Sequence, residues 1–288
     1  MLESFIFISG YILGMQLSRQ ILYHSFILKK VRRLLIPSIV FSVLYFFCFY
    51  QYEGLWSFFY SILNGCGHLW YLPMSFWCFL GGLALYSLKM SEKGKPFICL
   101  GLSVCSGLMS FLPFRIGNSC YYLLFFYLGM YMYQKRERII ARIKFHHVIL
   151  LCLLYIIAYI SLGSCKEWLS GLCLSSFLMK VFREIGLKLC VVSYSCLGLL
   201  FFYSAVNFFL KRQIRWQCPR WLFFINSLCF GIYVYQQFIL KYLYYGTSLP
   251  LLTGTYWLPW VGCLVTIILS VACASLTVKT KVGKYLIG

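Results

Sequence analysis

The stretch VILLCLLYIIAYISLG, residues 148–163, holds no charged residue in sixteen consecutive positions and decides how the whole chain must be interpreted. As a helix rising about 1.5 Å per residue, it approaches the width of a hydrocarbon layer about 30 Å thick. Similar blocks recur throughout, separated by short polar segments. Apolar and aromatic residues make up 62% of the 288 residues. The sequence therefore predicts an all-α, polytopic integral membrane bundle.

Composition and pattern exclude two other classes of fold. Charged residues are only 11% of the chain, whereas a soluble domain carries about 25%. A closed β-barrel would alternate polar and apolar residues in short strands, and these long apolar blocks do not. Both observations leave the helical bundle as the expected fold.

Apolar blocks of suitable length predict nine membrane spans. They cover residues 4–18, 34–50, 69–88, 97–114, 119–133, 148–163, 187–210, 221–243 and 256–277. The segment 168–184 is ambiguous because Trp168 and Phe177 occur there beside Lys180 and Arg183. We expect an amphipathic helix at the membrane interface in that segment.

The basic residues set the expected orientation of the chain. Twenty of the 26 Lys and Arg residues follow the first, third, fifth, seventh and ninth spans. Because positively charged loops stay in the cytoplasm, these five segments and the C-terminus are predicted to be cytoplasmic. Nine spans then place the N-terminus outside. The first span is also short, which predicts that the single domain of residues 1–288 lacks an upstream span.

The charge balance and the cysteines limit the expected partners. Against the 26 basic residues stand six acidic ones, all Glu. Because the basic residues lie between apolar blocks, we expect the lipid bilayer, and not nucleic acid, as their partner. The 15 Cys residues include no Cys-x-x-Cys pair and no cluster with zinc spacing, so no metal site is expected. A disulfide among Cys66, Cys120, Cys165 and Cys173 stays an open alternative.

The most distinctive local motif is GCGHLWYLP, residues 65–73, which opens the third span from the outer side. It places His68 at the mouth of the bundle, beside Trp70 and Tyr71. One interpretation is an aromatic belt with a polar histidine at the headgroup level. The other is a general base that orients or deprotonates a hydroxyl, with aromatic faces beneath a sugar ring.

A second motif is FIFISGYILG, residues 5–14. Its small residues Ser9, Gly10 and Gly14 lie on one helical face, which is typical of a helix-packing seam. The alternative is that Ser9 donates a hydrogen bond into a buried cavity.

A third motif is the basic cluster KKVRRLLIP, residues 29–37, at the cytoplasmic entry of the second span. Lys29, Lys30, Arg32 and Arg33 form either a topology anchor or a clamp for the phosphates of a cytoplasmic ligand.

The fourth motif, SLCFGIYVYQQ at residues 227–237, brings two amides into an apolar span. Polar groups at such depth face the bundle interior. Gln236 therefore either forms hydrogen bonds that hold neighbouring helices together or contacts the substrate.

These four motifs in this order, with the tail SLTVKTKVGKYLIG of residues 275–288, resemble the acyltransferase-3 family of bacterial membrane acyltransferases, especially its fucose 4-O-acetylase-like branch. The resemblance implies a bundle of about ten helices in the bacterial inner membrane. It further implies transfer of an acyl group, usually acetyl from acetyl-CoA, to a hydroxyl of a cell-surface glycan or its precursor. No permanently bound cofactor is implied.

A mechanism for this chain can be formulated as a hypothesis about individual residues. His68 would be the catalytic base, and the four cations of residues 29–33 would hold the phosphates of acyl-CoA. The expected substrate-binding residues are Trp70, Tyr71, Ser9 and Gln236. Two departures stand out: the Arg and His of the family's first span are missing, and Gln236 stands where the late motif often ends in His. Two alternatives therefore stay open, a transporter or flippase for glycan precursors and an inactive remnant of an acyltransferase.

Overall fold

A computed structural model of the chain describes residues 2–19, 22–50, 52, 54–109, 111–171, 177–211, 219–246 and 249–287. Throughout these ranges the regular structure is helical, and no strand occurs in them. The all-α membrane fold predicted from the sequence is confirmed. The chain divides into two compact units.

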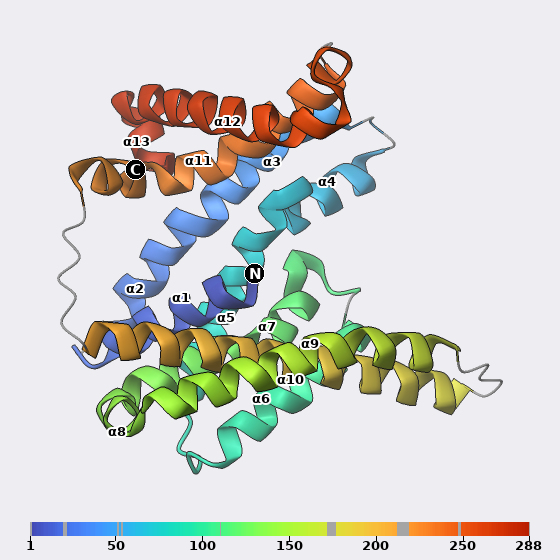
Figure 1. Ribbon diagram of the computed structural model, residues 1–288. Coiled ribbons are helices and arrows are strands. Elements are labelled where there is room, and N and C mark those ends of the chain that lie inside the picture. The colour runs from blue at the N-terminus through green and yellow to red at the C-terminus, as the bar shows by residue number, and fades with distance from the viewer. Residues whose placement is uncertain are drawn as a thin grey trace. The chain divides into compact units, whose positions relative to one another are not determined.

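Unit 1 comprises Met1–Leu22, Trp77–Leu112 and Ile116–Arg215. Its elements are α1 (Leu2–Leu17), most of α5 (Tyr71–Ser87), α6 (Gly94–Cys105), η3 (Ser106–Met109), α7 (Ile116–Gln134), α8 (Arg136–Arg142), α9 (Phe145–Gly171) and α10 (Phe177–Lys211) (Figure 1).

Unit 2 comprises Tyr23–Phe76, Pro113–Arg115 and Trp216–Gly288. Its elements are α2 (Tyr23–Lys30), the π-helical turn η1 (Val31–Leu35), α3 (Ile36–Phe49), α4 (Leu55–Asn64), the 3₁₀ turn η2 (Gly67–Trp70), the start of α5, η4 (Pro113–Arg115), α11 (Arg220–Tyr245), α12 (Leu249–Lys279) and α13 (Lys281–Ile287).

Each of the nine predicted spans overlaps a helix. In the described part of the chain, six helical segments are long and apolar enough to cross a membrane. They are Tyr23–Phe49, Gly67–Ser87, Phe145–Cys165, Val181–Lys211, Arg220–Tyr245 and Tyr256–Lys279. The first and fourth predicted spans fall on the shorter apolar helices α1 and α6, and the fifth falls on α7.

The interfacial helix predicted over 168–184 is not a separate element. Trp168 belongs to the last turn of α9 and Arg183 to the beginning of α10, while residues 172–176 lie outside the described ranges. The prediction was wrong because both long helices continue past their apolar blocks with polar ends. Cys173, one of the four cysteines considered for a disulfide, also lies outside the described residues. The other three are free thiols.

Close glycine contacts join α1 to α7 in unit 1. A Cβ atom on Gly10 would lie 1.9 Å from the carbonyl oxygen of Phe126, and one on Gly129 would lie 2.0 Å from that of Phe7. Gly14 faces Met130 and Tyr133 further along both helices. The two helices therefore run parallel, with backbones in contact. These helices carry the first and fifth predicted spans, which cross the membrane in the same direction and should therefore be parallel. The interpretation of Gly10 and Gly14 as a helix-packing surface is confirmed.

The core of unit 2 is built by α3, α11, α12 and α13. The buried residues Phe41 and Tyr45 of α3 belong to one apolar cluster with Val234 of α11 and Ala274 of α12. The Tyr235 and Thr277 hydroxyls, 2.8 Å apart, add a hydrogen bond between α11 and α12. This core supports the turn that carries His68.

Candidate functional site

His68 stands at the end of a tight turn that glycine makes possible. Gly65 has φ +76° and Gly67 has φ +56°, in the left-handed region that residues with a Cβ avoid. A Cβ on Gly65 would also lie 2.6 Å from the backbone nitrogen of Trp70. The sequence Gly-Cys-Gly therefore reverses the chain after α4 and delivers His68 to the first turn of η2.

Helix α3 holds this turn in place. The Cys66 N–H donates a hydrogen bond to the hydroxyl oxygen of Ser42 at 3.1 Å. A Cβ on Gly67 would approach the fully buried Tyr45 ring to 2.8 Å. The turn thus lies directly against the Tyr45 ring, and only glycine fits at that contact.

Two tyrosines flank the imidazole of His68. The ring centroids lie 5.9 Å from Tyr45 and 5.0 Å from Tyr233 of α11. The Tyr233 hydroxyl donates a hydrogen bond to the backbone carbonyl of His68, which ties η2 to α11. The ring is therefore oriented from two helices that are far apart in the sequence.

Three polar groups that are shielded from solvent lie close together at this point. Both ring nitrogens of His68 and the Tyr45 hydroxyl are shielded from solvent, and none makes a well-directed hydrogen bond within the described residues, although the backbone of Tyr233 and Val234 lies within hydrogen-bonding reach of the imidazole. Buried polar atoms are almost always paired, because an unpaired group costs about 1–3 kcal/mol. Their convergence indicates a place for a polar molecule, such as a substrate hydroxyl.

Lys241 of α11 brings a positive charge to the same region. Its ammonium lies 4.9 Å from the Tyr45 ring centroid, 5.2 Å from that of Phe49 and 5.4 Å from that of Tyr50. Lys241 makes no ion pair with any residue that the structure describes. It is also close enough to act electrostatically on Cys66 and His68. An uncompensated cation next to the imidazole favours negative charge there.

Asn64 anchors the other end of the turn to η4. The backbone N–H of Arg115 donates to the Asn64 side-chain oxygen at 3.2 Å, and the Arg115 Nε donates to the Asn64 carbonyl at 3.2 Å. Phe114 and Arg115 both have φ +57°, an uncommon conformation for residues other than glycine. These two hydrogen bonds fix η4 against the start of the turn.

The structure brings only some of the predicted site residues together. Tyr71 joins the His68 region, since its ring centroid lies 6.1 Å from that of Tyr233. Trp70 and Gln236 are half-buried in the same unit, on η2 and α11. Ser9 belongs to unit 1, so it is not part of the His68 region of unit 2.

The four predicted phosphate-binding cations lie where α2 passes into η1. Lys29, Arg32 and Arg33 are exposed, and the Arg32 guanidinium lies 3.7 Å above the ring centroid of Tyr285. Lys30 is half-buried, with its ammonium 5.2 Å from the Phe26 ring centroid. The exposed members of this cluster are accessible to a ligand.

Sequence reasoning missed three side chains of this site: Tyr45, Tyr233 and Lys241. Tyr45 is one of many aromatic residues in an apolar span, so nothing in the sequence pattern distinguishes it from the others. Tyr233 lies inside the quoted motif of residues 227–237, but its hydroxyl contact depends on how α11 packs. Lys241 did carry a signal, because it is a cation inside the long apolar helix α11.

The thiol of Cys66, two residues before His68, is expected to be unreactive. Burial raises its pKa to about 11, although the Lys241 ammonium acts in the opposite direction. At pH 8 such a thiol is roughly 0.1% ionised, against roughly 24% for an ordinary thiol of pKa about 8.5. Iodoacetamide, followed by peptide mass spectrometry, should modify Cys66 at least about 100-fold more slowly than a reference thiol introduced by Lys89→Cys in an exposed loop.

The pH dependence of that reaction separates ionisation from access. Because the pKa of Cys66 is raised, its rate should climb about tenfold per pH unit from pH 8 to pH 10, while the reference thiol levels off. Equal rates for the two cysteines at pH 8 would contradict the raised pKa.

The fold and this site define a polytopic helical membrane protein with a half-buried histidine at the start of a helical segment that is long enough to cross the membrane. A family model described as an acyltransferase domain matches residues 3–279, nearly the whole chain. The chain therefore belongs to the acyltransferase-3 family and is a membrane acyltransferase. No individual curated protein and no solved structure matches it significantly.

Proposed function

We propose that this protein transfers an acyl group, most simply acetyl, from acyl-CoA to a hydroxyl of a cell-surface glycan or its precursor in the bacterial inner membrane. The single observation that carries the proposal is the half-buried imidazole of His68, whose two nitrogens are shielded from solvent and make no well-directed hydrogen bond within the described residues. A neutral imidazole in that state can accept the proton of a bound hydroxyl.

The reaction needs one base and no redox partner. One nitrogen of His68 takes the proton of the acceptor hydroxyl while the hydroxyl oxygen attacks the thioester carbonyl. The C–S bond then breaks, and CoA leaves as a thiolate that takes the proton back from the imidazolium. The products are the ester and free CoA, and His68 returns to its neutral state.

Neighbouring residues supply binding and charge. The Lys241 ammonium favours the negative charge that develops on the carbonyl oxygen during the attack. Trp70 and Tyr71 offer aromatic faces to the acceptor sugar, and Gln236 offers an amide. At the cytoplasmic face, with the C-terminus on the same side, Lys29, Lys30, Arg32 and Arg33 bind the phosphates of the donor.

Radiolabelled acetyl-CoA tests this function directly. Membranes that contain the protein should incorporate label from the acetyl group into glycan or lipid-linked precursor, and membranes without it should not. Faster flipping of the lipid-linked precursor with no incorporation would favour the alternative of a transporter. Neither activity, with normal membrane insertion, would favour the inactive remnant and would contradict the proposal.

The Tyr233 hydroxyl positions His68, so the Tyr233→Phe variant should transfer the acyl group more slowly but should keep measurable activity. Removing the hydroxyl deletes the hydrogen bond to the His68 carbonyl while the ring contact at 5.0 Å stays. The lost hydrogen bond is worth about 1 kcal/mol, so acyl transfer should fall about fivefold. Initial rates with saturating donor measure the effect, and Tyr235→Phe, in the same helix, is the matched control. A Tyr233→Phe rate equal to that of the wild type would contradict the positioning role.

A further inference from the structure

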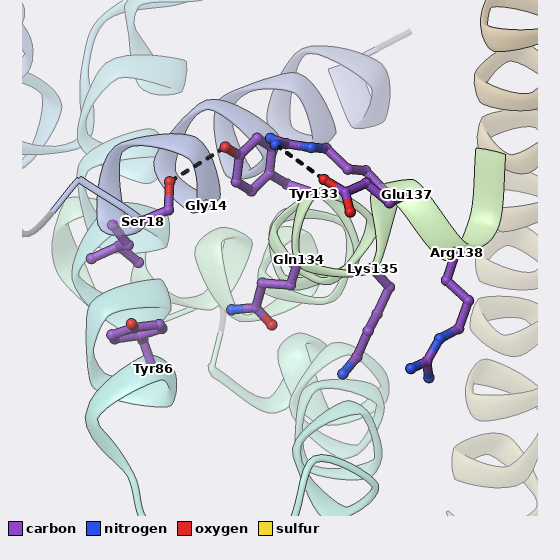
Figure 2. Close-up of a pocket in the computed structure, with 10 residues that line it drawn as sticks. Gly14, Ser18, Tyr86, Tyr133, Gln134, Lys135, Glu137 and Arg138 are labelled. Carbon is purple, nitrogen blue, oxygen red and sulfur yellow. Dashed lines mark hydrogen bonds and ion pairs between the residues drawn. The ribbon is translucent and has the colours of Figure 1, made fainter. Parts of the chain in front are cut away.

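Unit 1 contains a polar cavity at the place where α7 passes into α8. Its volume is about 580 Å³, within the range of small-molecule sites. The polar side chains that line it come from three regions: Ser18 after α1, Tyr86 of α5, and the junction of α7 and α8 with Tyr133, Lys135, Arg136 and Arg138. Figure 2 shows Lys135 and Arg138 extending from this junction in the same direction.

The cavity carries an excess of positive charge. Its lining holds three cations, Lys135, Arg136 and Arg138, and one carboxylate, Glu137. The Glu137 side chain is 91% exposed and lies 3.8 Å from Arg136. Lys135 lies 3.9 Å from Glu92, and Arg138 makes no ion pair with any described residue. Exposed pairs of this length are weak, so all three cations are available to an anionic ligand.

Neutral groups hold part of this lining in place. The Tyr133 hydroxyl lies 3.3 Å from the Ser18 hydroxyl, and the Arg136 guanidinium lies 4.4 Å above the Tyr133 ring centroid. The hydrogen bond between Arg136 and the Tyr133 hydroxyl raises the pKa of Arg136, which is therefore charged at every relevant pH. Hydroxyls and a stacked guanidinium together form a preorganised set of donors.

We propose that this cavity binds a phosphate ester, carried either by a soluble acyl-CoA or by the headgroup of an anionic phospholipid. Two arginines and a lysine provide forked and point-charge donors that suit phosphate oxygens. The segment of residues 135–144 also carries five basic residues and is one of the predicted cytoplasmic loops, and both acyl-CoA and anionic lipid headgroups are found on the cytoplasmic side. With acyl-CoA as the source, this cavity would replace the cluster of Lys29, Lys30, Arg32 and Arg33 as the main phosphate site of the donor, and this version rests on the proposed function, whereas phosphate binding itself does not.

Binding by the intact protein in nanodiscs tests the proposal. The test has two arms, one for each ligand. The first measures binding of radiolabelled CoA to the protein in discs of phosphatidylcholine alone. The second measures the thermal stabilisation of the protein when phosphatidylglycerol is added to those discs. The test variant is Lys135→Gln with Arg138→Gln. Its matched control is Arg142→Gln, which removes a cation from the same helix α8 at a position that does not line the cavity.

Loss of at least about tenfold in CoA affinity, or loss of the phosphatidylglycerol stabilisation, in the test variant but not in Arg142→Gln supports the proposal and identifies the source. Unchanged responses to both ligands, or equal losses in the control, overturn it. These outcomes are independent of catalysis: a wild type that binds CoA here yet transfers no label refutes the proposed function and leaves this inference standing.

Discussion

The His68→Ala variant should lose acyl transfer by at least about 100-fold, because a general base in position typically contributes 10²–10⁴-fold. The substitution removes both unpaired nitrogens from the site. It leaves the backbone carbonyl that accepts the Tyr233 hydrogen bond, so η2 stays attached to α11. The loss should therefore appear in kcat while the protein inserts and folds. Incorporation of acetyl label per mole of purified protein measures it.

Two further variants make this result specific. His68→Gln keeps a polar side chain of similar length but cannot act as a base near neutral pH, so it should be as inactive as His68→Ala. His146→Ala removes a histidine from the start of α9, outside the site, and should keep at least about half of the activity. Full transfer by His68→Ala would refute the assignment of His68 as the base.

Much of the fold could be predicted because the membrane imposes simple rules. Blocks such as residues 148–163 must be helical, since every backbone polar group in a bilayer needs an internal partner. The short helices were not predicted: α2, α4, α8 and α13 are too short or too polar to produce a span signal. Their positions depend on tertiary packing, which no hydropathy window contains.

The candidate site was predictable only where its residues are adjacent in the sequence. His68 and Tyr71 occur in one motif and share one region of the structure. Lys241 reaches the site because α11 packs on α3, nearly 200 residues away in the chain. Tyr45 reaches it because the turn before η2 folds back on α3. A single sequence gives no register for such packing, so these partners could not be identified in advance.

The glycine contact between α1 and α7 in unit 1 shows again that a sequence can identify a packing surface but not its partner. Gly10 and Gly14 predicted a packing surface on α1, and the structure confirms it. The sequence did not reveal that the surface meets Gly129 of α7. Gly10 of α1 and Gly129 of α7 act as a pair, because each allows the backbone of the opposite helix to come close.

The Gly10→Ala variant should be clearly destabilised by its single added methyl group. Alanine favours a helix over glycine by about 1 kcal/mol, which alone would stabilise α1. The added Cβ, however, would lie 1.9 Å from the carbonyl oxygen of Phe126 and 2.8 Å from its carbon, atoms of a helix backbone that cannot move aside locally. Overpacking of this kind costs about 1–3 kcal/mol and sometimes more, so we expect a net loss of about 2 kcal/mol.

Thermal unfolding in detergent measures that loss, and a second glycine calibrates it. A loss of about 2 kcal/mol corresponds to a decrease of roughly 4–8 °C in Tm for a chain of this size. Gly101→Ala in α6 adds the same methyl where no atom lies within 4 Å, so helix propensity should raise its Tm slightly. Opposite signs at the two glycines would establish that backbone contact between α1 and α7, and not helix propensity, governs the stability of this seam. A Tm for Gly10→Ala at or above that of the wild type would mean that the two helices do not pack this closely.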